Sequence, residues 1–157
     1  MTPSAAYARP SYIDVMFAPS YRGSHITPAP SAQTSMVDSA VAGKVWFITG
    51  ASSNFGVALT GALLRAGYCV VATARTVSKI PFETHESLLI LSLDVSDPAS
   101  ISCAFDVAVK TFGRIDVVVN KAGVHACGEL ESIPETSARE MFDVQLWGPA
   151  RIQAAVS

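Results

Sequence analysis

The sequence predicts an α/β fold, built on a doubly wound parallel sheet with helices on both faces. Two observations carry this prediction. Four short apolar runs, each of strand length, alternate along the chain with stretches of helical spacing. The first run also leads directly into a turn that contains glycine. Continuous apolar runs are typical of parallel strands that are covered on both sides, whereas half-exposed strands alternate apolar and polar residues.

The four expected strands are rich in β-branched and aromatic residues. They read VWFIT, YCVVATA, LLILSLD and IDVVVN, and they cover residues 45–49, 68–74, 88–94 and 115–120. Successive parallel strands need right-handed crossovers. The doubly wound solution for four such strands has the spatial order 3-2-1-4. Compared with a complete doubly wound sheet, the expected sheet is truncated to about four strands.

Three helices are expected between and after these strands. Val57–Ala66 has the apolar spacing of a helix, and Gly67 suits the left-handed residue that ends one. The second helix begins at the N-cap Asp97, followed by a proline, and ends near Gly113. A last helical segment opens at Pro134, and the pair Gly148-Pro149 should weaken or kink it.

Residues 1–42 differ in composition from the rest. They are rich in Ser, Ala and Pro and show neither a helical nor a strand period, so a disordered extension is expected there. Arg9 and Arg22 with few acids leave a transit peptide as one alternative. Another is an over-extended start, with Met36 beginning a chain that soon enters its first strand. Residues 43–157 then form a partial nucleotide-binding domain.

Charge and composition argue against nucleic acid, membrane and metal ions as partners. The sequence contains 11 Lys and Arg residues and 13 Asp and Glu residues, which give a formal net charge of −2. No basic stripe favours nucleic acid, and no apolar run is long enough for a membrane span. Three scattered cysteines form no CxxC pair, which favours a reduced, cytoplasmic setting. Three isolated histidines predict no metal site.

The turn after the first strand reads TGASSNFG. A dinucleotide-binding turn must bend sharply, let backbone approach the diphosphate, and pack its helix against the strand. Gly50 and Gly56 suit the first and third tasks, and Asn54 stands at the second. Because Asn tolerates positive φ, the turn geometry is expected to survive. Any tight strand-to-helix turn can use glycine, so a purely structural turn stays an alternative.

Three segments together resemble the short-chain dehydrogenase/reductase family. The run Thr49–Gly56 is similar to the family's TGxxxGxG signature, Asp94-Val95 follows the third strand as in the family, and Asn120–Gly123 resembles its NNAG. The resemblance extends from about Gly43 to the end of the chain. It implies a Rossmann-like domain that binds NAD or NADP, in an oxidoreductase acting on a carbonyl or alcohol.

The resemblance also implies which residues hold the cofactor. The phosphates and the nicotinamide ribose would lie along Ser52, Ser53, Asn54 and Phe55, in the turn that Gly50 and Gly56 shape. Asp94 would bond the adenine amino group with the Val95 backbone beside it. Asn120, Ala122 and Gly123 would pass over the adenosine ribose. A solvated carboxylate is the alternative for Asp94, and a structural bond across the sheet is the alternative for Asn120.

Arg75 bears on the choice between the two nucleotides. It follows the second strand, and no Asp or Glu lies between Gly67 and Pro81. An acid there would bind the ribose 2′-hydroxyl of NAD, whereas an Arg can neutralise the 2′-phosphate of NADP. NADP is therefore the expected cofactor, with NAD second. A solvated surface Arg is the alternative.

No catalytic residue is expected in this chain. The family uses a Ser and a Tyr with Lys four residues later, and here Lys follows none of Tyr7, Tyr12, Tyr21 and Tyr68 at that spacing. Lys121 replaces the second Asn of NNAG, and Gln145 aligns with a further catalytic Asn of the family. The expectation is a chain that is truncated before the catalytic residues and binds cofactor at most.

Two other interpretations stay open. One is a non-catalytic interaction or regulatory module, which pairs with another copy or with an intact family member. It would use the exposed edge of the strand at 115–120 or the last helix. The other is an active reductase that uses unfamiliar groups.

Overall fold

The computed structural model describes residues 43–155. Four strands form one parallel sheet in the order β3-β2-β1-β4, as the sequence predicts. The strands are β1 (Val45–Ile48), β2 (Cys69–Ala74), β3 (Leu88–Ser92) and β4 (Val117–Val119). The expected disorder of residues 1–42 lies outside the described residues.

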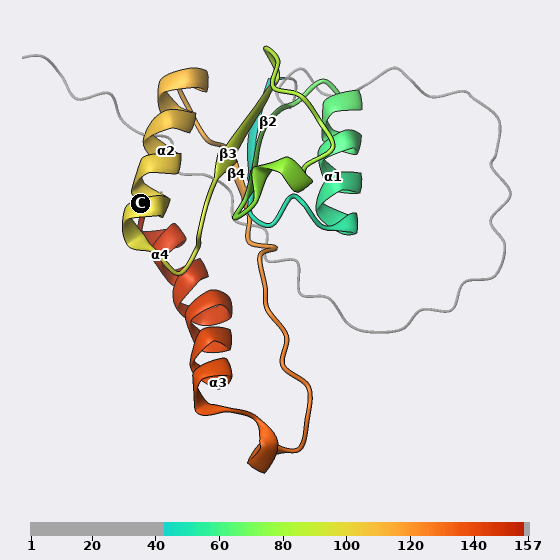
Figure 1. Ribbon diagram of the computed structural model, residues 1–157. Coiled ribbons are helices and arrows are strands. Elements are labelled where there is room, and N and C mark those ends of the chain that lie inside the picture. Colours follow the sequence, from blue (N-terminus) through green and yellow to red (C-terminus); the bar gives the residue numbers. More distant parts are fainter. Residues whose placement is uncertain (1–42, 156–157) are drawn as a thin grey trace, which may run out of the picture.

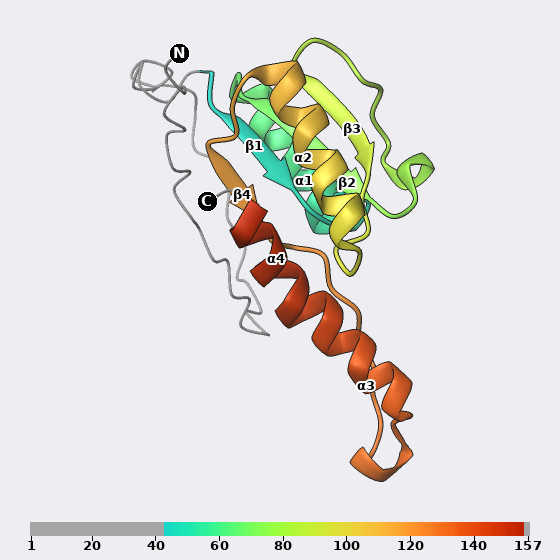
Figure 2. The same ribbon diagram turned by 90° about the vertical axis from the view of Figure 1, so that its left-hand side faces the viewer.

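Helices cover both faces of the sheet, which makes it doubly wound (Figure 1). Helix α1 (Asn54–Arg65) lies on one face, and α2 (Pro98–Phe112) lies on the other beside α4 (Gly148–Ala155). After a 90° rotation about the vertical axis, α3 (Glu135–Phe142) is seen to extend away from the sheet in line with α4 (Figure 2). The short turn η1 (Val77–Lys79) follows β2, and η2 (Leu130–Ser132) precedes α3.

The sheet has a hydrophobic core on each of its two faces. Each strand contributes side chains to both cores, because successive side chains point to opposite faces. Phe47 is buried on the α2 side, where its ring stacks on Phe105 with centroids 4.4 Å apart. The neighbouring Ile48 is buried on the α1 side with Leu63. This alternation of fully buried residues explains why the strands read as continuous apolar runs.

The helix boundaries follow from capping. Asp97 accepts a hydrogen bond from the Ala99 N–H at 3.0 Å, and α2 ends at Gly113, both as expected. Gly113 has the left-handed conformation. Helix α1 begins at Asn54, three residues before the expected start. The earlier start has a local cause, because Ser53 is the N-cap and its side chain accepts from the Gly56 N–H.

Gly148-Pro149 changes the helix without stopping it. Between α3 and α4 lies one π-helical stretch, η3 (Asp143–Trp147), in which the Gly148 N–H donates to the Asp143 carbonyl. Proline lacks the N–H that an α-helix needs, and a wider turn accommodates that loss. Gly148 also permits close packing, because a Cβ there would stand 3.1 Å from a Val95 methyl group.

Gly50 allows a close backbone approach between the segments that follow β1 and β4. Its φ is +68°, and an added Cβ would meet the Ala122 Cα at 2.9 Å. Gly67 also has a positive φ, of +83°, but a Cβ there would meet nothing within 4 Å. The two positions therefore separate backbone strain from steric clash.

We predict that Gly50→Ala lowers the free energy of unfolding by about 3 kcal/mol, since it adds overpacking to left-handed strain. Gly67→Ala carries the strain alone and should cost about 1 kcal/mol. Urea unfolding followed by circular dichroism measures both. Equal losses for the two variants would show that the contact with Ala122 is not a tight one.

Candidate functional site

A cavity of about 200 Å³ lies at the carboxyl ends of the strands. This is the edge at which doubly wound sheets bind ligands, in the crevice where the strand order reverses. Here that reversal falls between β1 and β4, which are neighbours in the sheet but lie far apart in sequence. The four connections that follow the strands contribute most of the lining, and the end of β2 and η3 (Asp143–Trp147) add one residue each. The lining residues are Gly50, Ser52, Ser53, Ala74, Arg75, Thr76, Lys79, Leu93, Asp94, Val95, Lys121, Ala122, Gly123, Val124 and Val144.

The turn after β1 is held from both sides. The Ala51 N–H donates to the Thr73 carbonyl at 2.8 Å, and the Thr49 N–H donates to the Val119 carbonyl at 3.0 Å. Gly56 has no room for a side chain, since a Cβ would lie 2.7 Å from the Ala51 Cα. The glycine is therefore needed to seat α1 on the turn, which is the packing task expected of it.

Asn54 does not have the positive φ that a glycine at this position of the turn could adopt. It is the first residue of α1 and has helical backbone, and its side chain is exposed. A side chain is tolerated here because the helix has already begun. Neither Asn54 nor Phe55 lines the cavity; Phe55 is 41% exposed on the first turn of α1.

The segment after β4 is fixed over Gly50 by one hydroxyl group. Thr49 Oγ1 accepts hydrogen bonds from the Lys121 N–H at 2.9 Å and the Ala122 N–H at 3.0 Å. Thr49 is itself buried. Ala122 and Gly123 consequently line the cavity, whereas the half-buried Asn120 lies outside the lining.

Asp94 sits in a compact loop between β3 and α2. Its Oδ1 accepts from the Ser96 hydroxyl at 2.6 Å and from the Ser96 N–H at 2.9 Å. The hydrogen bond from the Ser96 side chain is the main cause that lowers the pKa of Asp94, and Arg75 adds a smaller electrostatic contribution. A fixed carboxylate thus faces the cavity next to Val95.

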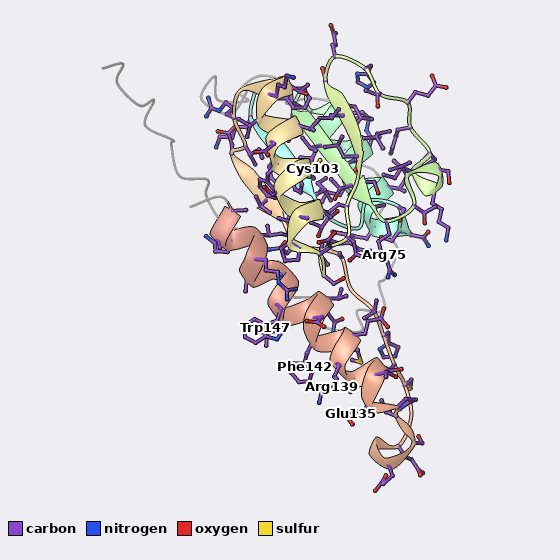
Figure 3. The ribbon with its side chains drawn as sticks, turned by 60° about the vertical axis from the view of Figure 1, so that its left-hand side comes forward. Arg75, Cys103, Glu135, Arg139, Phe142 and Trp147 are labelled. Atoms are coloured by element: carbon purple, nitrogen blue, oxygen red, sulfur yellow. The ribbon has the colours of Figure 1, made fainter. Side chains whose placement is uncertain are left out.

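Arg75 lies at the rim of the cavity and is paired. Its guanidinium is 3.8 Å from the Glu140 carboxylate of α3, and both side chains are more than half exposed. We call the continuous run of α3, η3 and α4 (residues 135–155) the long helix. Figure 3 shows Arg75 on the side of the sheet that faces the long helix. An exposed pair of this kind contributes little stability. Arg75 can therefore exchange Glu140 for an anionic ligand.

Two further cations in the lining were not expected there. Lys79 reaches the cavity from η1, and Lys121 reaches it from the end of β4. The signal for Lys79 was its position four residues after Arg75, in a short segment closed by Pro81. The sequence had marked Lys121 only as a departure from a motif. Its Nζ donates a hydrogen bond to the Ser53 hydroxyl, and burial lowers the pKa of its ammonium group.

The described residues place no tyrosine at this cavity. Tyr68 lies just before β2, at the opposite end of the sheet, with its ring 5.8 Å from the Trp46 ring. Within residues 43–155, no group of three or more His, Cys, Asp or Glu side chains could hold a metal ion. The lining therefore suits binding of an anionic ligand, since it holds three cations and one carboxylate.

The part of the chain that the structure describes contains no helix long and apolar enough to cross a membrane.

Comparisons with known proteins agree with this geometry. An uncharacterized oxidoreductase of Schizosaccharomyces pombe is 41% identical over 105 residues, which are 67% of this chain and 36% of that protein. An alcohol dehydrogenase from Thermococcus sibiricus, solved with 5-hydroxy-NADP, is 35% identical with a TM-score of 0.67. The match covers 72% of this chain and 51% of that one.

A 3-ketoacyl-(acyl-carrier-protein) reductase from Brucella melitensis, solved with NADH, has a TM-score of 0.68 at 27% identity. That match covers 72% of this chain and 48% of the reductase. The first three curated relatives are covered over only 36%, 37% and 43% of their lengths. The family model described as short chain dehydrogenase matches residues 44–157, and this chain belongs to the short-chain dehydrogenase/reductase family of oxidoreductases.

Proposed function

We propose that this chain binds the adenosine diphosphate half of a nicotinamide dinucleotide, with NADP preferred over NAD. The observation that carries the proposal is the cavity itself, which joins Arg75 and Lys79 on one side to the glycine turn on the other. Arg75 and Lys79, here called the rim cations, suit a 2′-phosphate. The glycine turn after β1 and the N-terminus of α1 suit a diphosphate. Relatives solved with NADH and with 5-hydroxy-NADP support a nicotinamide dinucleotide as the ligand and leave its type open.

Each predicted residue has a proposed task in this site. Asp94 accepts from the adenine amino group, and the Val95 backbone lies beside the ring. Ala122 and Gly123 contact the adenosine ribose, while Asn120 holds their segment at the end of β4. The remaining residues form the diphosphate turn: Gly50, Ser52, Ser53, Asn54, Phe55 and Gly56.

The bound nicotinamide would give or accept a hydride at a carbonyl or alcohol carbon, as in the family. This chain's residues bind and orient the nucleotide; none of those described supplies the proton. Asp94 is a poor general acid, because the bonds from Ser96 favour its ionised form. Residues 43–157 are thus proposed to act as a partial cofactor-binding domain.

Arg75→Gln should weaken NADPH binding about tenfold and leave NADH binding unchanged, because a hydrogen bond between charged groups contributes about 1.5–3 kcal/mol, less at an exposed rim. Isothermal titration of the full chain with each nucleotide measures this. Lys110→Gln is the matched control, since it removes one exposed charge from the last turn of α2. Equal weakening of NADPH and NADH would contradict the assignment of Arg75 to the 2′-phosphate.

A second candidate function is self-association, and an exposed apolar face on the long helix favours it. Phe142, Leu146 and Trp147 are 62%, 51% and 52% exposed. Figure 3 shows Phe142 and Trp147 projecting from the side of the helix away from the sheet. Large apolar side chains gathered on one face are typical of an interaction surface. In the described residues β4 also pairs only with β1, so its other edge is open.

We expect the chain to form dimers through this face, and the double variant Phe142→Ser/Trp147→Ser to shift them to monomers. Val107→Ser serves as control, because Val107 is an exposed apolar residue on α2. Sedimentation velocity over a range of concentrations distinguishes the species. A wild-type chain that stays monomeric throughout would remove this second candidate.

A further inference from the structure

Lys121 occupies an unusual place for a lysine. It follows β4 directly, where the family motif has a neutral Asn, and its side chain crosses to the turn after β1. There its Nζ donates to the hydroxyl of Ser53, which is 68 residues away in sequence and caps α1. The shorter side chain of Asn would not extend as far along this path.

The backbone on both sides of this contact is fixed. On one side, Thr49 Oγ1 holds the Lys121 and Ala122 N–H groups against the glycine turn. On the other, Ser53 Oγ accepts from the Gly56 N–H at 3.4 Å and donates to the Gly50 carbonyl at 3.3 Å. The ammonium group is therefore held at the first turn of α1.

This arrangement places two positive charges together. The N-terminus of a helix carries a partial positive charge. No acidic residue lies in the first turn of α1, and across residues 43–155 no carboxylate lies within 4.0 Å of the Lys121 ammonium group. Partial burial adds a desolvation cost, which is why the pKa of Lys121 is lowered. A bound anion would offset both costs.

We propose that Lys121 is a direct ligand of the diphosphate of the bound dinucleotide. The inference rests on the proposed function, because it assigns a charged contact within the same cavity. An ammonium group can donate to several phosphate oxygens at once. Lys121 thereby adds a positive charge beside the N–H groups of the turn, at a position that is neutral in the family motif.

This role differs from that of the rim cations in a measurable way. The diphosphate is common to NADPH, NADH and ADP-ribose, whereas the 2′-phosphate belongs to NADPH alone. Lys121 should therefore contribute equally to the binding of all three ligands. Arg75 and Lys79, on the far side of the cavity, should contribute only to NADPH.

The test is titration calorimetry of the full chain and its variants with NADPH, NADH and ADP-ribose. Lys121→Gln and Lys121→Asn should weaken each ligand by about tenfold to a hundredfold, the range expected for one charge-assisted contact. Lys121→Arg keeps the charge and should bind within a fewfold of the wild type. Thermal unfolding of each variant verifies that it is folded.

The outcomes separate this inference from the proposed function. If the wild type binds NADPH and Lys121→Gln binds it with the same affinity, the proposed role of Lys121 is overturned. The proposed function would still stand. Tighter binding by Lys121→Gln would overturn it too, because the lysine would then obstruct the site. A loss confined to NADPH would reassign the lysine to the 2′-phosphate. A wild-type chain that binds none of the three ligands would refute both proposals.

Discussion

Two features of the turn after β1, the hydroxyl of Thr49 and the lack of a side chain at Gly50, determine the position of the candidate site. The hydroxyl accepts from two successive N–H groups of the segment after β4, at 2.9 and 3.0 Å. That segment can come so close only because Gly50 has no Cβ. Two connections that are distant in sequence are thereby locked together at the point where the strand order reverses. The positions of Lys121, Ala122 and Gly123 follow from this contact.

The same constraint explains the chemistry of the cavity. With the turn and the segment after β4 fixed, the loops after β2 and β3 complete the lining with Arg75, Lys79 and Asp94. The long helix closes the cavity with Val144 and approaches Val95 through Gly148. Cations therefore lie both at the rim and at the glycine turn, a distribution that suits the proposed nucleotide with a diphosphate and a 2′-phosphate.

Much of the fold could be predicted from the sequence, because burial on both faces leaves a direct record in continuous apolar runs. Strand order followed from the doubly wound arrangement with right-handed crossovers. Gly50, Asp94 and Gly123 could be placed because they follow strands. Side-chain contacts between distant segments left no such record. Lys121 looked like a simple departure until its contact with Ser53 was known, and the Arg75–Glu140 pair joins a strand end to a helix 65 residues later.

Local backbone geometry was the other gap. A rule about the glycine turn allowed a positive φ at Asn54, yet the Ser53 cap starts α1 early enough to make that residue helical. Gly148-Pro149 was expected to weaken or kink the last helix, and just before this pair the α-helical pattern gives way to a π-helical stretch, whose exact place the sequence did not indicate. At Asn54 a neighbouring hydrogen bond, from the Gly56 N–H to the Ser53 side chain, decided the outcome.

The proposed tasks of Arg75, Asp94 and Lys121 all depend on a nucleotide site at the carboxyl ends of β1–β4. Its most direct test is an amide NMR titration of the full chain with NADPH. Saturable shifts are expected in four segments, around residues 50–56, 75–79, 94–96 and 120–124. Shifts that are absent at millimolar NADPH, or that spread over the outer face of α3 and α4, would contradict it.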